Sequence, residues 1–100
     1  MLSSTARVAT ATPERYAKQL VAHLGRRSAA VEREDGSHQL ALGDGKGVVA
    51  VGDDAVVLEA TAFDEAALAV VEDVLARHLV RFGARQELQV HWVRGGQPVR

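Results

Sequence analysis

Apolar residues recur with the spacing of an α-helix over residues 65–82. Asp64 is a suitable N-cap, because its carboxylate can accept hydrogen bonds from the free N–H groups of the first turn. Gly83 follows the last apolar position, and we expect it to end the helix in the left-handed conformation. Five apolar side chains fall on one narrow arc of this helix, which we assign to the core: Leu68, Val71, Leu75, Leu79 and Phe82.

A second helix is predicted over residues 13–25. Thr12 can cap it, and Pro13 stands at the first helical position, where its missing N–H costs no hydrogen bond. Gln19 and His23 are spaced i,i+4 on the flank of the apolar stripe, so they should look toward the other helix. The stripe itself consists of Tyr16, Ala17, Leu20, Val21 and Leu24.

Apolar and polar residues alternate in the rest of the chain, which indicates strands. The pairs Asp35-Gly36 and Asp53-Asp54 are typical of tight hairpins, and residues 43–47 predict a longer glycine-rich loop. Most strands have one apolar face, so only one side of the sheet needs a cover. The pattern predicts an α+β two-layer sandwich, with a mainly antiparallel sheet and both helices on one face, in the order β-α-β-β-β-β-α-β. The expected strands are 5–10, 29–35, 38–43, 47–52, 55–62 and 88–93.

Length and composition narrow the class of protein. One hundred residues suit a single domain, which we place at 1–100 with an ordered core over about 4–94 and a loose tail over 95–100. Twelve basic and thirteen acidic residues are scattered along the chain, so the basic footprint of a nucleic-acid binder is missing. No apolar run approaches the ~20 residues of a membrane helix, and the start does not resemble a secretory signal. Since there is no cysteine either, the composition favours a cytoplasmic protein and leaves its oligomeric state open.

The histidines supply the best candidate chemistry. His78 lies at the edge of the apolar arc of its helix, where the simplest interpretation is a core-edge histidine held by one hydrogen bond. In the two-layer arrangement, His23 and His78 should meet at the seam between the helices. The histidine spacings match no local metal motif, and two imidazoles without a carboxylate make a poor metal site, so we assign no metal ligands. The expected site for a small ligand consists of Tyr16, Gln19, His23, His78 and Arg81.

A second candidate surface is the open face of the sheet. The closing strand should turn Gln89 and His91 to this face, together with Arg7 and Glu59 from other strands. A solvated sheet face is the simplest interpretation, and a surface for a protein partner is the alternative.

Two segments of the chain resemble a known family. YAKQLVAHLGRR (16–27) contains a Q-L-x-x-H motif, and EDVLARHLVRFGARQELQVHW (72–92) contains R-H-L-x-R-F-G followed by E-L-x-V-x-W. With the opening STARVAT, these residues resemble a bacterial family called domain of unknown function 2218, over nearly the whole chain. The resemblance implies a fold similar to the TATA-binding protein. It also implies a setting in iron or siderophore metabolism, because some members are fused or adjacent to flavin-dependent siderophore-interacting proteins, which are therefore candidate partners. It implies no reaction and no cofactor.

Three functions therefore stay open. The first is a binding or accessory module that uses the seam around His23 and His78. The second is a partner-binding or self-associating domain that uses the open sheet face. The third is an enzyme with His78 as acid/base, although no serine lies in a nucleophile elbow and residues 43–47 lack the spacing of a phosphate loop. We assign no catalytic residue.

Overall fold

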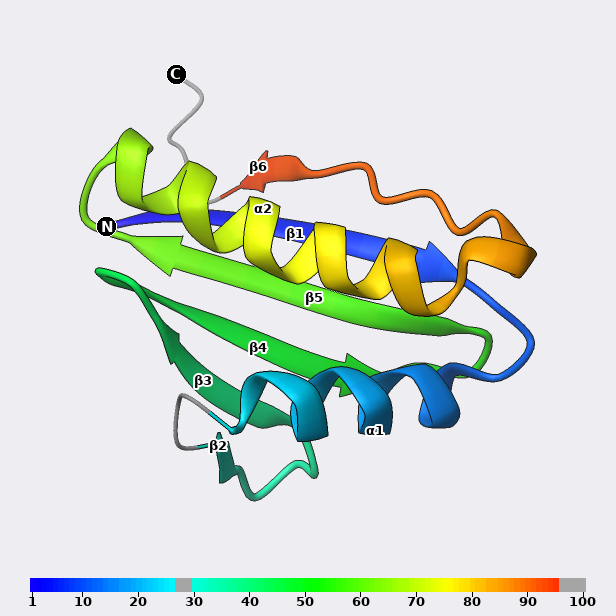
Figure 1. Ribbon diagram of the computed structural model, residues 1–100. Coiled ribbons are helices and arrows are strands. Elements are labelled where there is room, and N and C mark those ends of the chain that lie inside the picture. Colours follow the sequence, from blue (N-terminus) through cyan, green and yellow to red (C-terminus); the bar gives the residue numbers. More distant parts are fainter. Residues whose placement is uncertain (27–29, 96–100) are drawn as a thin grey trace.

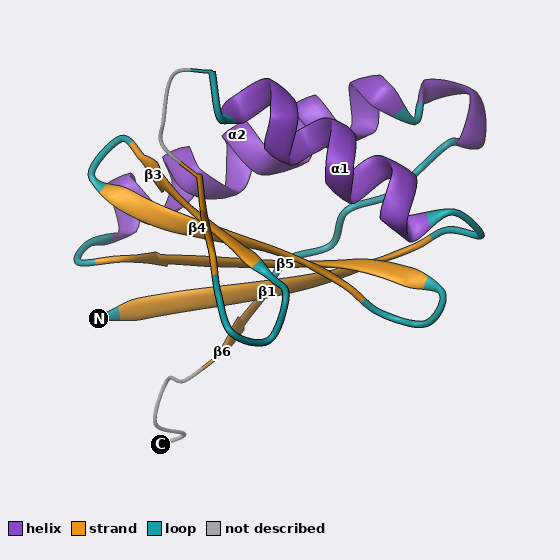
Figure 2. Ribbon diagram, turned by 90° about the horizontal axis from the view of Figure 1, so that it is seen from below, coloured by secondary structure: helices purple, strands orange, loops and turns teal. Residues whose placement is uncertain are grey.

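A six-stranded antiparallel sheet carries two helices on one face in the computed structural model, which describes residues 1–26 and 30–95 (Figures 1 and 2). The strands lie in the order β2-β3-β4-β5-β1-β6. The predicted fold class, the order of the main elements and the single covered face are confirmed. The elements are β1 (Leu2–Ala9), α1 (Pro13–Leu24), β2 (Ala30–Glu32), β3 (His38–Leu42), β4 (Gly45–Val51), β5 (Ala55–Ala62), α2 (Glu65–Phe82), a short 3-10 helix η1 (Ala84–Gln86) and β6 (Val93–Gly95).

The register of the strands separates an apolar face from an open face. In β1, Ala6 and Val8 are buried while Arg7 and Ala9 are exposed, as the alternation predicts. Both helices pack on the apolar side, α2 mainly over β5 and β4 and α1 mainly over β4 (Figure 2). None of the helices in the described residues is long and apolar enough to cross a membrane. The bulkiest fully buried side chains are Leu20, Leu40, Leu58, Leu68, Leu75 and Leu79.

The glycine-rich segment 43–47 forms a shorter loop than predicted. Leu42 pairs with Gly45, so only Gly43 and Asp44 form the turn, and β4 begins two residues before its predicted start. Gly43 has a φ of +60°, a conformation that glycine adopts without a steric penalty.

Two glycines of β4 let α2 lie close to the sheet. A Cβ atom on Gly45 would lie 2.6 Å from both the carbonyl oxygen of Thr61 and Cγ2 of Val71. A Cβ atom on Gly47 would lie 3.0 Å from Cδ1 of Leu75. In the sequence these glycines suggest a loop. In the structure they belong to a strand, and their lack of a side chain leaves the space that α2 occupies.

Strand β2 ends at Glu32, before the predicted boundary, because the chain turns at once. Gly36 has a φ of +87°, and the Asp35 carboxylate accepts hydrogen bonds from the Ser37 hydroxyl at 2.6 Å and the Ser37 N–H at 2.9 Å. These bonds lower the pKa of Asp35, the hydroxyl having the larger effect. Residue 29, where the predicted strand begins, lies outside the described residues.

The closing strand begins later than predicted. Leu88 is buried and Trp92 half-buried, so the alternation marks correctly which side chains face the core. Backbone pairing with β1 starts only at Val93, however, and Gly95 belongs to β6 rather than to a loose tail. Residues 96–100 lie outside the described part of the chain. The alternation of apolar residues shows which side chains are buried. A strand also requires backbone hydrogen bonds to a neighbouring strand, which the alternation does not show.

The end of α2 also differs from the prediction. Gly83 has a φ of −101°, which is not left-handed. A Cβ atom there would lie 2.2 Å from Cδ1 of Leu88, which folds back over the helix end and is only 7% exposed. A glycine is thus required at this position for space and not for backbone conformation.

An ion pair joins β6 to α2. Arg94 donates from Nη2 to Oε1 of Glu72 at 2.9 Å and from Nε to Oε2 at 3.2 Å. Arg94 lowers the pKa of Glu72, against the opposing effect of partial burial. The buried Ser4 hydroxyl lies beside this carboxylate and adds to the lowering of its pKa, although it makes no hydrogen bond of good geometry within the described residues.

Candidate functional site

His23 and His78 meet between the two helices. Their ring centroids are 4.9 Å apart, with the ring planes tilted by 42°. His23 also contacts Phe82 edge-on, with ring centroids 5.5 Å apart. The helical period thus places both imidazoles at the seam where the sequence predicts them.

One hydrogen bond fixes the tautomer of His78. Its Nδ1 lies 2.7 Å from the carbonyl oxygen of Val74, one turn earlier in α2. A carbonyl can only accept, so Nδ1 carries the proton, and Nε2 makes no hydrogen bond to a residue that the structure describes. The ring is half-buried, and Val74 provides the single partner that the simplest interpretation of a core-edge histidine requires.

The imidazoles open into a hollow of about 580 Å³, here called the histidine hollow. Arg26 and Arg77 contribute guanidinium groups to it, and Arg77 pairs with the exposed Asp73 at 3.3 Å. No Asp or Glu belongs to this lining among the residues that the structure describes. The lining residues are His23, Leu24, Arg26, Leu42, Gly43, Val74, Arg77 and His78.

Three other residues of the predicted ligand site lie in a neighbouring hollow of about 400 Å³, here called the arginine hollow. It lies between the first half of α1 and the C-terminal end of α2, and it includes η1. Within the described chain, its three arginines form no salt bridge with a carboxylate. The lining residues are Arg15, Tyr16, Gln19, Arg81, Phe82, Ala84, Arg85 and Gln86.

The two hollows adjoin, because Phe82 lines the arginine hollow and also touches His23 of the histidine hollow. We call them together the interhelical groove. The sequence analysis missed four of its arginines: Arg15, Arg26, Arg77 and Arg85. A signal exists for part of this group, since Arg77 lies one helical turn before Arg81 on α2. A chain-wide charge count hides this grouping.

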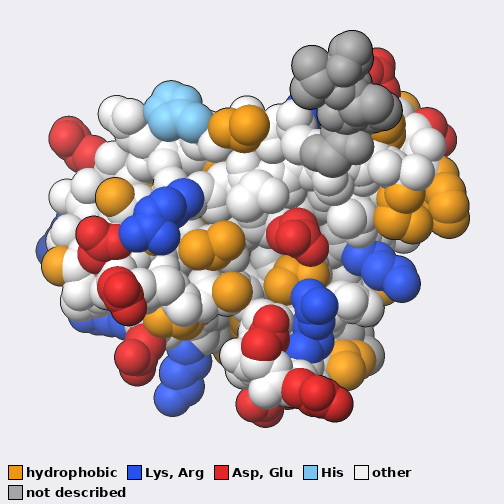
Figure 3. All heavy atoms as spheres, turned by 180° about the vertical axis from the view of Figure 1, so that it is seen from behind, with side chains coloured by type: hydrophobic (Ala, Val, Ile, Leu, Met, Phe, Trp, Pro, Cys, Tyr) orange, Lys and Arg blue, Asp and Glu red, His pale blue; other side chains and the backbone are white. Residues whose placement is uncertain are grey.

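Two of the four residues of the predicted partner surface lie on strands of the sheet. Arg7 and Glu59 lie on the open face of the sheet, where Arg7 pairs with Asp54. Gln89 and His91 precede β6 and are therefore not on a strand, and they contact each other at 3.3 Å. On the side opposite the helices, charged and apolar side chains are intermingled (Figure 3).

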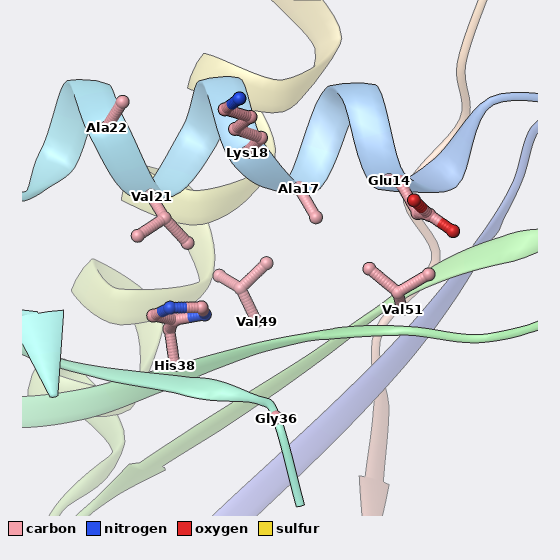
Figure 4. Close-up of a pocket in the computed structure, with 9 residues that line it drawn as sticks. All are labelled: Glu14, Ala17, Lys18, Val21, Ala22, Gly36, His38, Val49 and Val51. Carbon is pink, nitrogen blue, oxygen red and sulfur yellow. The ribbon is translucent and has the colours of Figure 1, made fainter. Parts of the chain in front are cut away.

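A third hollow, of about 300 Å³, lies on the other side of α1, against the sheet (Figure 4). Val21 of α1 and Val49 of β4 supply apolar walls, and His38 rises from β3 toward the helix. Lys18 belongs to the rim. None of the predicted site residues lies here, which makes His38 and Lys18 suitable controls for experiments on the groove.

Comparison with known proteins agrees with the architecture. A model of bacterial uncharacterised proteins, DUF2218, matches residues 5–93. The chain belongs to this family. The NMR structure of PA4090 from Pseudomonas aeruginosa is similar over 100% of this chain and 99% of that chain, with a TM-score of 0.75 and 27% sequence identity. No curated protein matches the chain.

Proposed function

We propose that this member of the DUF2218 family is a small binding module whose histidine hollow holds an anionic ligand. The observation that carries the proposal is the lining: two imidazoles 4.9 Å apart share a hollow with Arg26 and Arg77 and with no carboxylate among the described residues. Guanidinium groups match carboxylate and phosphate oxygens, and the imidazoles add polar ring nitrogens to the same lining.

The donor set favours an anion over a metal ion. Among the described residues, no three His, Cys, Asp or Glu side chains gather into a metal site. Two arginines in the same lining would repel a cation, whereas each of them attracts an anion.

The family suggests the setting. Because some relatives are associated with flavin-dependent siderophore-interacting proteins, we infer a role in iron or siderophore metabolism, with such a flavoprotein as the partner. A ferric chelate with free carboxylates has the charge that this hollow requires, so carboxylate chelates of iron are the ligand class that we propose.

Titration of the ¹⁵N-labelled protein with citrate and then with ferric citrate tests the proposal, at constant ionic strength. We expect saturable shifts of the His23 and His78 rings and of the Gly43 amide with citrate, and paramagnetic broadening of the same signals with ferric citrate.

Matched substitutions locate the site. His78→Gln should weaken citrate binding about 10-fold, the factor that corresponds to ~1.4 kcal/mol. His38→Gln, which changes a half-buried histidine outside the groove, should leave the affinity unchanged. Thermal melting of each variant verifies that it folds. Citrate affinities that are equal in the wild type and in His78→Gln would rule out the histidine hollow as the site.

A further inference from the structure

We infer that the ligand carries two separated anionic groups, one for the histidine hollow and one for the arginine hollow. This inference rests on the proposed function, because it takes the histidine hollow as the first point of attachment. It goes beyond the proposed function by specifying how many anionic groups the ligand carries and how far apart they are.

The arginine hollow has the composition of a second anion site. Arg15, Arg81 and Arg85 line one small volume, and Gln19 and Gln86 add neutral amide donors. Three like charges gathered without a carboxylate partner among the described residues make a positive surface, which attracts an anion.

Three other described arginines pair with carboxylates, whereas Arg26 and Arg33 form no salt bridge within the described chain. Arg7 pairs with Asp54, Arg77 with Asp73, and Arg94 with Glu72 and Glu65. The arginine hollow thus gathers cationic side chains that the described fold leaves without a carboxylate, directly beside the proposed binding site.

The spacing of the two hollows sets the length of the ligand. Gln19 and His23 are one turn apart on α1, and Arg77 and Arg81 are one turn apart on α2. Four residues of helix rise by roughly 6 Å, so the centres of the two hollows differ by about one turn along the groove. The edge contact of Phe82 with His23 lies between the hollows, which provides an aromatic surface for the middle of the ligand.

A small molecule with carboxylate or phosphate groups at both ends satisfies this arrangement. Calorimetric titration of the full chain with succinate, adipate and suberate, and with hexanoate as the single-carboxylate reference, measures the dependence on length. Phosphate and tripolyphosphate form a second arm, which distinguishes a phosphate ligand from a carboxylate ligand. Ionic strength and pH are held constant.

We expect one dianion of the series to bind at least ~10-fold more tightly than its single-charge reference, because the second attachment is intramolecular. Joint substitution Arg81→Gln and Arg85→Gln should abolish this gain. Lys18→Gln, which removes an equal charge from the other side of α1, should preserve the gain.

The failures of the two proposals are distinguishable. If single anions bind in the histidine hollow but dianions bind no more tightly, or if the Arg81 and Arg85 substitutions leave the dianion affinity unchanged, the two-site inference is overturned and the proposed function stands. If no single anion binds there, and His78→Gln has no effect on any dianion, the proposed function fails together with the inference.

Discussion

Replacement of Gly83 by alanine tests how the end of α2 is built. The added Cβ would lie 2.2 Å from Cδ1 and 2.6 Å from Cγ of Leu88, far inside van der Waals contact. The φ of −101° suits alanine, so backbone strain does not contribute. Leu88 must therefore leave its position over the helix end.

The expected cost follows from the burial of Leu88, which is 7% exposed. Exposure of a fully buried leucine costs about 1.5–3 kcal/mol. An alanine in place of glycine restricts the unfolded chain, which returns about 0.4–1 kcal/mol. We expect Gly83→Ala to lower the free energy of unfolding by about 1–2 kcal/mol.

Urea denaturation at 25 °C, followed by the fluorescence of the half-buried Trp92, measures this change. Gly95→Ala is the control, since nothing lies within 4 Å of its added Cβ and its effect should stay within ~0.5 kcal/mol. In a Leu88→Ala background the clash partner is gone, so Gly83→Ala should become neutral or stabilising. An equal cost in both backgrounds would refute the reasoning.

Three further predictions concern stability. Gly45→Ala should cost about 1–3 kcal/mol in urea denaturation, because its Cβ meets the Thr61 backbone at 2.6 Å, which cannot move aside as a flexible side chain can. Asp64→Ala should lower the melting temperature through the loss of a cap worth about 1 kcal/mol, since the carboxylate accepts from the Ala67 N–H at 2.8 Å; an unchanged melting temperature would deny the cap a role. The pKa of Glu72 is lowered in the folded protein, so its ionised form stabilises the fold above the ordinary value of 4.5, and this contribution disappears as pH falls through the lower folded pKa. The stability difference between wild type and Glu72→Gln should therefore be constant near neutral pH and shrink below about pH 4.5, and a difference that grows with acid would contradict it.

Helix positions are well predicted from this sequence because the apolar periodicity of a helix is contained in its local sequence. The bounds 65–82 are those of α2, and the apolar stripes face the sheet. Strand bounds are predicted less well, because pairing depends on neighbours far away in the chain. Residues 88–92 alternate as a strand does, yet no ladder forms until Val93 reaches β1. Gly45 and Gly47 suggest a loop, and only their contacts with the rest of the core explain their place in β4.

In the candidate site, too, local features are predicted from the sequence and long-range ones are not. Periodicity places His23 and His78 at one seam, where the structure brings their rings together. The arginines around them were missed because their effect depends on which charges share a surface, and a sum over the chain conceals this. Even within the predicted set, Tyr16, Gln19 and Arg81 line a different hollow from the histidines, a partition that helical spacing alone does not reveal.

The place of β1 in the sheet has a consequence for the folding pathway. Its neighbours are β5 and β6, with Ala9 opposite Ala55 and Ser3 opposite Gly95. The hairpins β3-β4 and β4-β5 need only short turns, whereas β1 can dock only after a long loop closes, which is entropically costly. We therefore expect the central hairpins to form early and β1 to be among the last strands to join the sheet. The rate-limiting step of folding would then be the docking of β1 between β5 and β6, which come much later in the sequence.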